Sequence, residues 1–108
     1  MGQYFYIVNE SKREYLHPHK FNEGLKLAEF GMSSEGSMTY LAWLLCDNDN
    51  VPWGHPMLGH WLGDVVTVAG DYGPVDRKTS DRKPCNLHHL ADEEFEDISA
   101  KVMAITKM

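Results

Sequence analysis

Two aromatic and β-branched stretches of this chain alternate as β-strands do. The first covers residues 3–8 and, after a polar turn, is followed by a short run at 13–16. This order predicts a β-hairpin, which must end near Pro18 because proline lacks the amide hydrogen that a ladder needs. The second stretch covers residues 61–72 and holds a β-branched run between two Gly-Asp pairs. We expect it to form the central strand of the fold, over residues 64–69.

Helical patterns occur twice along the chain. Residues 37–46 are apolar nearly all round, which predicts the buried helix of the domain. Apolar residues then recur at helical spacing from Ala91 to Ile105, and acidic residues crowd 92–97, as expected near a helix N-terminus. Residues 25–30 fit a short strand or a short helix, and an extended segment is favoured. The polar residues 72–87 predict an exposed loop.

These elements fit into a single domain. A chain of 108 residues with 43% hydrophobic residues can bury a core but has no room for a second one. We therefore expect one α+β domain over residues 1–108, with a small, mostly antiparallel sheet and two helices packed on it.

Charge and cysteine content limit the partners. A net charge of −6 argues against the broad basic surface that binds a nucleic-acid backbone and favours a protein partner or a small ligand. Neither a secretory leader nor an apolar run of about 18 residues is seen, so we expect no membrane association and a cytoplasmic location. Cys46 lies in an apolar run and Cys85 in a polar one, and a disulfide between them stays open.

Several short segments carry a family resemblance. The chain resembles a family of small uncharacterised proteins of bacteria and their mobile elements, which open with Met-Gly-Gln-Tyr and carry a Gly-Asp, β-branched, Gly-Asp-Tyr block. The resemblance implies a self-contained domain and brings no catalytic residue, cofactor or activity with it. The chain departs from the family pattern at residues 51–56, where a glycine-rich stretch is expected. The segments that carry the resemblance are residues 1–4, 13–16, 18–21, 24–27, 29–31, 63–64 and 70–72.

Motifs for catalysis or metal binding are weak. Cys85, His88 and His89 come nearest to the close ligand spacing of a zinc site, and a nucleophilic cysteine beside histidine uses the same residues. The aspartates of the two Gly-Asp pairs would lie roughly 23 Å apart on one strand, so they are interpreted as turn residues. The run at 47–50 lacks the glycine and glutamate of a calcium loop, and no phosphate-binding glycine loop occurs.

The remaining candidates form a binding surface in the loops on either side of the central strand. Aromatic residues, methionine and arginine are typical of recognition surfaces. We therefore expect a small acidic interaction protein that binds a partner macromolecule, and, if it comes from a mobile element, an inhibitor of a host complex. The alternative is a small enzyme or metal-dependent ligand-binding protein that uses the histidine-rich loops at 55–60 and 85–89. The predicted binding surface comprises Trp53, His55, Met57, His60, Trp61, Tyr72, Arg77, Lys78, Arg82 and Lys83.

Overall fold

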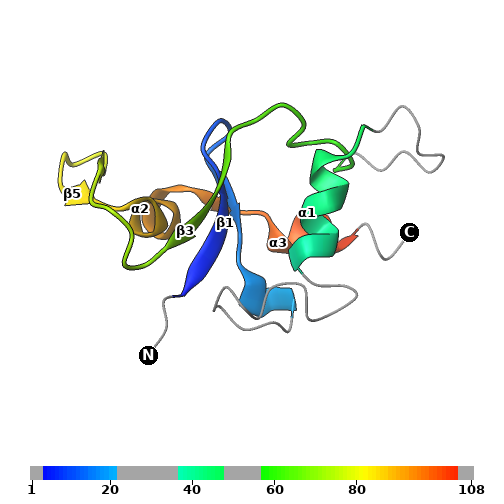
Figure 1. Ribbon diagram of the computed structural model, residues 1–108, viewed down its shortest axis with the longest axis horizontal. Helices are drawn as coiled ribbons and strands as arrows, with labels where there is room; N and C mark the ends of the chain where they lie inside the picture. The colour runs from blue at the N-terminus through cyan, green and yellow to red at the C-terminus, as the bar shows by residue number, and fades with distance from the viewer. Residues whose placement is uncertain (1–3, 22–36, 48–56, 105–108) are drawn as a thin grey trace.

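A four-stranded sheet forms the centre of the molecule (Figure 1) in the computed structural model, which describes residues 4–21, 37–47 and 57–104. The strand order is β3-β1-β2-β6, with β1 antiparallel to both neighbours and β2 parallel to β6. The predicted hairpin is confirmed. The strand predicted at 64–69 forms as β3, but it lies at an edge of the sheet and not at its centre. The segment predicted at 25–30 lies outside the described residues. The strands are β1 (Phe5–Asn9), β2 (Glu14–Leu16), β3 (Val66–Gly70) and β6 (Glu96–Asp97).

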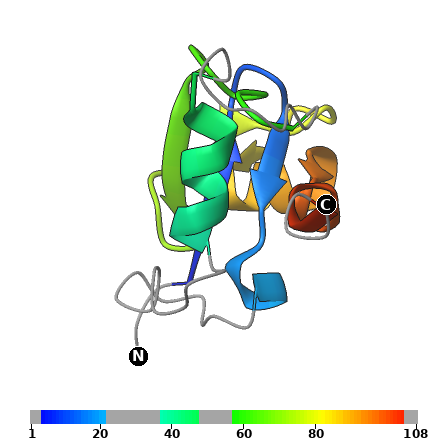
Figure 2. The same ribbon diagram turned by 90° about the vertical axis from the view of Figure 1, so that its right-hand side faces the viewer.

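Helices cover both faces of this sheet, because successive side chains of a strand point to opposite sides. Tyr6 and Val8 of β1 pack with the buried residues of α2 (Leu87–Glu94) on one face. Ile7, between them, packs on the other face with α1 (Ser37–Leu45) and α3 (Ser99–Met103). Figure 2 shows α1 in front of the strands and α2 behind them. The domain is therefore α+β with a mostly antiparallel sheet, as predicted, but three helices pack on it instead of two.

The third helix arises because the predicted C-terminal helix is interrupted. Phe95 has an extended backbone (φ −92°, ψ 159°), and β6 follows it. The Glu96 amide donates to the Arg13 carbonyl and the Ile98 amide to the Tyr15 carbonyl, each at 3.0 Å. Pairing with β2 thus replaces helical hydrogen bonds at this point. The prediction of one continuous helix from Ala91 to Ile105 was wrong.

The acidic residues at 92–94 consequently end α2, whereas Asp97 accepts a hydrogen bond from the Ser99 amide at 2.9 Å at the start of α3. Carboxylates are unfavourable at a helix C-terminus, so they need partners. The Glu94 carboxylate accepts hydrogen bonds from the Arg13 guanidinium at 3.1 Å and from the Ser80 amide at 2.7 Å, and these contacts lower its pKa. Asp97 binds Lys20 at 2.5 Å. The contacts of Glu94 offset the unfavourable end of α2.

The helix at 37–46 forms as α1, but it is not buried all round. Tyr40 and Leu44 lie in the core, while Met38 and Leu45 are 39% and 37% exposed. Only one side of α1 faces the sheet and α3, which leaves its other side without a covering element among the described residues. The expectation of a fully buried helix was therefore wrong.

The segment at 72–87 contains a small hairpin, β4 (Arg77–Lys78) paired with β5 (Pro84–Cys85), and not only a loop. It projects from one end of the molecule (Figure 1). The described chain also has a short 3-10 helix, η1 (Pro18–Phe21), directly after β2. Within the described ranges, no helix is both long and apolar enough to cross a membrane.

Candidate functional site

The outer edge of β3 is one of the two edges of the four-stranded sheet. The residues that flank β3 bond to the residues that flank β1. The Glu10 amide donates to the Val65 carbonyl at 2.9 Å, and the Asp71 amide donates to the Tyr4 carbonyl at 3.0 Å. Hydrogen bonding alternates along an antiparallel pair, so the N–H and C=O groups of Val66 and Val68 point away from β1. No strand of the described chain pairs with them.

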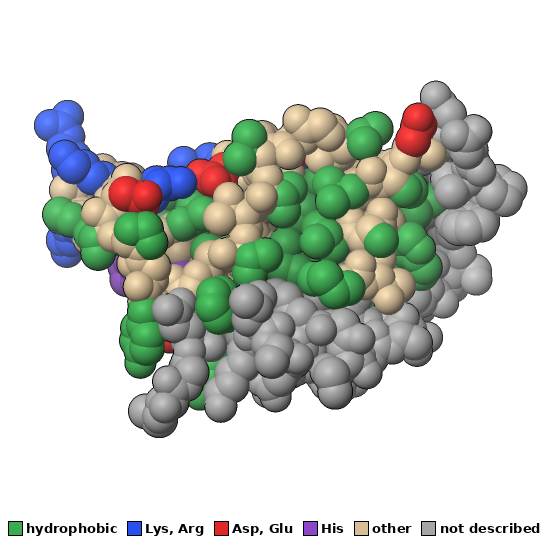
Figure 3. All heavy atoms as spheres, viewed as in Figure 1, with side chains coloured by type: hydrophobic (Ala, Val, Ile, Leu, Met, Phe, Trp, Pro, Cys, Tyr) green, Lys and Arg blue, Asp and Glu red, His purple; other side chains and the backbone are tan. Residues whose placement is uncertain are grey.

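The residues of β3 include none of the types that normally protect an edge strand. Proteins usually block such edges with lysine, proline or a bulge, but β3 reads Val-Thr-Val-Ala-Gly. Val65 is 60% exposed and Val68 is 41% exposed. Figure 3 shows hydrophobic side chains gathered over β3 and α1 on this face. The large apolar residues exposed around β3 are Tyr4, Leu62, Val65, Val68, Tyr72 and Val75.

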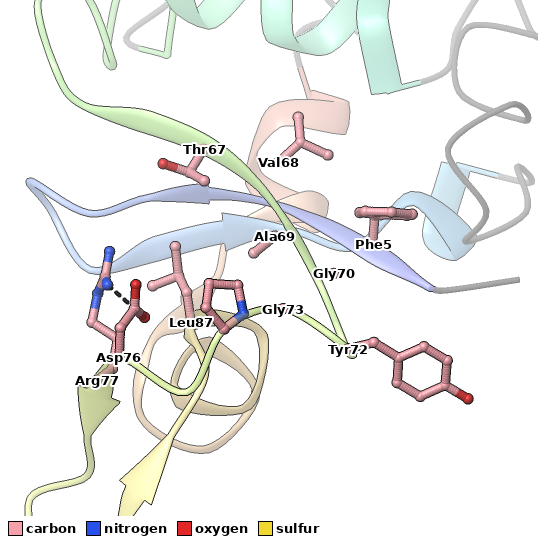
Figure 4. Close-up of a pocket in the computed structure, with 11 residues that line it drawn as sticks. Phe5, Thr67, Val68, Ala69, Gly70, Tyr72, Gly73, Asp76, Arg77 and Leu87 are labelled. Atoms are coloured by element: carbon pink, nitrogen blue, oxygen red, sulfur yellow. Dashed lines mark ion pairs between the residues drawn. The ribbon is translucent and has the colours of Figure 1, made fainter.

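A cavity of about 410 Å³ lies along this strand. Its lining comes from all of β3 except Val66, from Phe5 on β1, from Leu87 on α2 and from the turn that leads into β4 (Figure 4). Most of these side chains are apolar, and the volume is within the usual range for a ligand pocket. The cavity therefore places an apolar depression directly beside unpaired strand backbone.

Charged groups lie at one end of the cavity. Arg77 donates to Glu10 at 2.7 Å and forms an ion pair with Asp76 at 2.7 Å (Figure 4). The Thr67 hydroxyl donates to the other Glu10 oxygen at 2.7 Å. Hydrogen bonds from Arg77 and then Thr67 hold the pKa of Glu10 below its ordinary value, so the carboxylate stays ionised at neutral pH. This network fixes the side chains of Arg77 and Thr67 at the mouth of the cavity.

The predicted binding residues divide between the surface and the core. Tyr72 and Arg77 line the cavity, and the Tyr72 ring, 67% exposed, extends away from the other lining residues (Figure 4). Trp61 instead lies fully buried in the core, and Met57 packs beside it. The placement of Trp61 on a binding surface is thus corrected: its indole N–H donates to Glu14 Oε1 at 2.8 Å inside the protein. Trp53 and His55 lie outside the described residues.

Two of the predicted site histidines, His60 and His88, lie on opposite faces of the sheet. His60 Nε2 lies 3.1 Å from Glu14 Oε1, beside buried Trp61 on the α1 face of the sheet. His88 stacks on Tyr6 on the α2 face, with ring centroids 4.0 Å apart. The sheet separates these two side chains, so His60 and His88 cannot act on one small ligand.

The His88 environment favours neutral groups. Burial lowers the pKa of His88, and its Nε2 is buried without a hydrogen-bond partner. Burial, together with the 2.8 Å hydrogen bond from its hydroxyl to Asp92, raises the pKa of Tyr6. Neutral imidazole and phenol rings stacked in this way pack the core between β1 and α2.

The proposed zinc ligands Cys85, His88 and His89 line one surface depression of about 340 Å³, but their side chains do not form a metal-binding group. Cys85 is buried, and burial raises the pKa of its thiol, which disfavours the thiolate needed for metal binding or nucleophilic attack. His89 is exposed and lies 3.2 Å from Glu93 on α2. Among the residues that the structure describes, no three metal-binding side chains come together. Cys46 and Cys85 are both free thiols.

Several residues of this site were not singled out from the sequence. Val68, Phe5 and Leu87 line the cavity, and Glu10 fixes Arg77. The available signal was the absence of any charged or proline residue in the β3 run, but a central strand has the same composition. Only the strand order places this run at an edge.

The chain has no match among protein-family models, curated proteins or solved structures. The family resemblance therefore stays a prediction, and the function must be argued from the site itself.

Proposed function

We propose that this chain is a protein-interaction module that binds an extended segment of a partner protein as an additional strand on the outer edge of β3. The observation that carries the proposal is the outward backbone of Val66 and Val68, which no strand of the described chain pairs with, beside an apolar cavity of about 410 Å³. In strand addition, main-chain hydrogen bonds supply affinity and pockets for alternate side chains supply specificity. Both parts are present along β3.

An extended peptide suits this edge better than a compact ligand does. Only another strand presents N–H and C=O groups at the spacing that β3 offers. Its alternate side chains would lie over Val68 and Phe5 on one face of the sheet, and toward Ala69 and Leu87 on the other (Figure 4). We therefore expect a partner segment with apolar residues on both of its faces.

The partner segment can be identified by photocrosslinking. A benzoylphenylalanine in place of Tyr72 lies beside the cavity, and the same group in place of exposed Glu93 on α2 is the matched control. With the full chain expressed in its native host, we expect a discrete adduct from position 72 and none from position 93. The crosslinked partner peptide is then mapped by mass spectrometry and synthesised.

The synthetic peptide tests strand addition directly. The Val68 N–H points away from β1, so Val68→Pro removes an outward donor without removing a hydrogen bond of the native sheet. We expect Val68→Pro to remain folded by circular dichroism and to weaken peptide binding roughly tenfold or more, because a partner carbonyl loses its donor. Val68→Thr keeps the donor and should bind nearly as wild type does.

Three results would contradict the proposal. They are equal crosslinking from positions 72 and 93, adducts only with a second copy of this chain, and equal peptide binding by Val68→Pro and wild type. Amide hydrogen exchange gives an independent readout, because the bound peptide should slow exchange at Val66 and Val68.

A further inference from the structure

The β4–β5 hairpin is a basic projection on an acidic protein. From Arg77 to Cys85 it carries four basic residues and one aspartate, a net charge of +3. Because the whole chain carries −6, the remaining residues sum to −9. Figure 3 shows the Lys and Arg side chains gathered at one end of the molecule, where Figure 1 places the hairpin. The hairpin is thus a region of net positive charge on a protein that is otherwise net negative.

The hairpin is anchored to the body of the protein both at strand β4 and at its turn. Arg77 is held by Glu10, and the Ser80 amide donates to Glu94 on α2 at 2.7 Å. Thr79 is buried, and its amide donates to the Lys83 carbonyl at 3.0 Å. The basic side chains at the tip therefore project from a fixed backbone.

The cations at the tip differ from the other cations of the described chain in having no carboxylate partner. Elsewhere in the described ranges each lysine or arginine forms an ion pair: Lys12 with Asp64, Arg13 with Glu94, Lys20 with Asp97, Arg77 with Glu10 and Asp76, and Lys101 with Glu96. Lys78, Arg82 and Lys83 are exposed and have no such contact. Within the described ranges, these three hairpin cations thus have no carboxylate partner, although carboxylates outnumber cations in the chain.

The backbone at Arg82 gives a second, independent observation. Its φ is 66°, in the left-handed region where glycine or asparagine is normally found. The Arg82 amide closes the turn onto the Thr79 carbonyl at 2.8 Å, so this position corresponds to the glycine of a common hairpin turn. Arginine here costs backbone energy, and no contact within the described chain offsets it. Residues held in strained conformations cluster at functional sites.

We infer that the tip of the β4–β5 hairpin, formed by Lys78, Arg82 and Lys83, binds an acidic segment of a partner protein. One guanidinium and two ammonium groups on the same hairpin offer bidentate and point-charge contacts to carboxylates. A long polyanion such as duplex DNA fits less well, because it would extend past the tip and bring phosphates against a body that carries −9. A short acidic segment covers the tip alone. This surface is independent of strand addition at β3.

The test uses the full chain and a fluorescein-labelled hexaglutamate peptide, with binding followed by fluorescence anisotropy at low salt. Lys78→Ala/Lys83→Ala removes two unpaired cations, and Lys20→Ala/Lys101→Ala removes two paired ones. Both variants change the net charge from −6 to −8. We expect the hairpin variant to bind about tenfold more weakly than wild type, while the control variant changes by less than about twofold.

Binding should also weaken as salt rises, because exposed charges are screened. The proposal is overturned if the two double variants weaken binding equally, which would indicate net charge alone, or if hexaglutamate does not bind at millimolar concentration. It is also overturned if a 12-base-pair DNA duplex binds more tightly than hexaglutamate and depends on Lys78 and Lys83. If Arg82→Gly weakens peptide binding while the protein stays folded, the tip assignment is supported.

Discussion

Two arginines, Arg13 and Arg82, occupy left-handed backbone positions with φ of 57° and 66°. Each follows a tight turn in a hairpin, where glycine would avoid the steric cost. Arg13 gains contacts from this position, because its guanidinium binds Glu94 at 3.1 Å and lies 4.8 Å from the centroid of the Phe95 ring. Arg82 gains no comparable contact within the described chain. The same backbone conformation thus has a structural role at one position only.

This contrast predicts opposite effects of the same substitution. Arg82→Gly relieves the strain and removes no internal contact, so we expect the free energy of unfolding to rise by roughly 0.5 kcal/mol after the added flexibility of the unfolded chain is subtracted. Arg13→Gly should be less stable than Arg82→Gly by about 1 kcal/mol, since it loses an ion pair and a cation–π contact. Urea denaturation of both variants measures the difference. Equal stabilities would show that the Arg13 contacts contribute nothing.

At the scale of elements, the sequence pattern predicts local structure well and fails where distant pairing decides. The β1–β2 hairpin, β3 and α1 follow from runs and turns that are contiguous in the chain. The break after Glu94 does not, because periodicity continues through it. Residues 96 and 97 leave the helix to pair in parallel with β2, some 80 residues earlier in the sequence. A local sequence pattern cannot show that pairing with β2 replaces helical hydrogen bonds at these residues.

The junction between β6 and α3 depends on one buried hydroxyl. Ser99 is fully buried, and its Oγ accepts a hydrogen bond from the His17 amide at 2.9 Å, which joins the end of β2 to the start of α3. Ser99→Ala leaves that amide without its acceptor, so we expect a loss of about 1–3 kcal/mol in the free energy of unfolding. Exposed Ser80→Ala should change it by less than about 0.5 kcal/mol. Thermal and urea unfolding of both variants test this, and equally mild effects would contradict it.

At the scale of the whole molecule, the candidate site could be predicted only in part. Arg77 and the other basic residues of the hairpin lie at the surface as expected, because their charge excludes them from a core. Tyr72 is also exposed as expected, but chemistry does not decide this, since three other tyrosines are buried. The β3 edge could not be predicted, since the Val66–Gly70 run has the composition of a central strand and becomes an edge only through the order β3-β1-β2-β6. Burial of Trp61 likewise depends on its long-range hydrogen bond to Glu14.

The stability of the whole domain should depend on pH through His88, which is held between β1 and α2. Burial is the largest influence on the imidazole and lowers the pKa of His88. The charges of Asp71, Asp92 and His17 have smaller effects on this pKa, and the Tyr6 ring stacks on the imidazole. Above the unfolded pKa of about 6.5 the imidazole is uncharged in both the folded and the unfolded state. The contribution of His88 to the free energy of unfolding is therefore fully present there. As pH falls below that value, the unfolded chain takes up the proton more readily, and stability is lost.

Carboxylates contribute to acid unfolding only at lower pH. The pKa values of Glu10, Asp64, Glu94 and Asp97 are lowered by their partners, so their stabilising contributions are lost below about pH 4.5. Between about pH 6.5 and 5, the decline should therefore come mainly from His88. We expect urea denaturation to show a clear loss of stability across this interval in the wild type.

Replacement of the imidazole isolates this contribution. His88→Phe keeps a flat ring against Tyr6 and has no titrating group, so the decline between about pH 6.5 and 5 should become shallower. His89→Gln, on the exposed side of α2, should keep the wild-type slope. If His88→Phe retains the full slope, another group must cause the decline. His17 is then the next residue to replace, because its ring centroid lies 4.9 Å from that of Tyr6. A flat wild-type profile over this interval would contradict the coupling of His88 ionisation to folding.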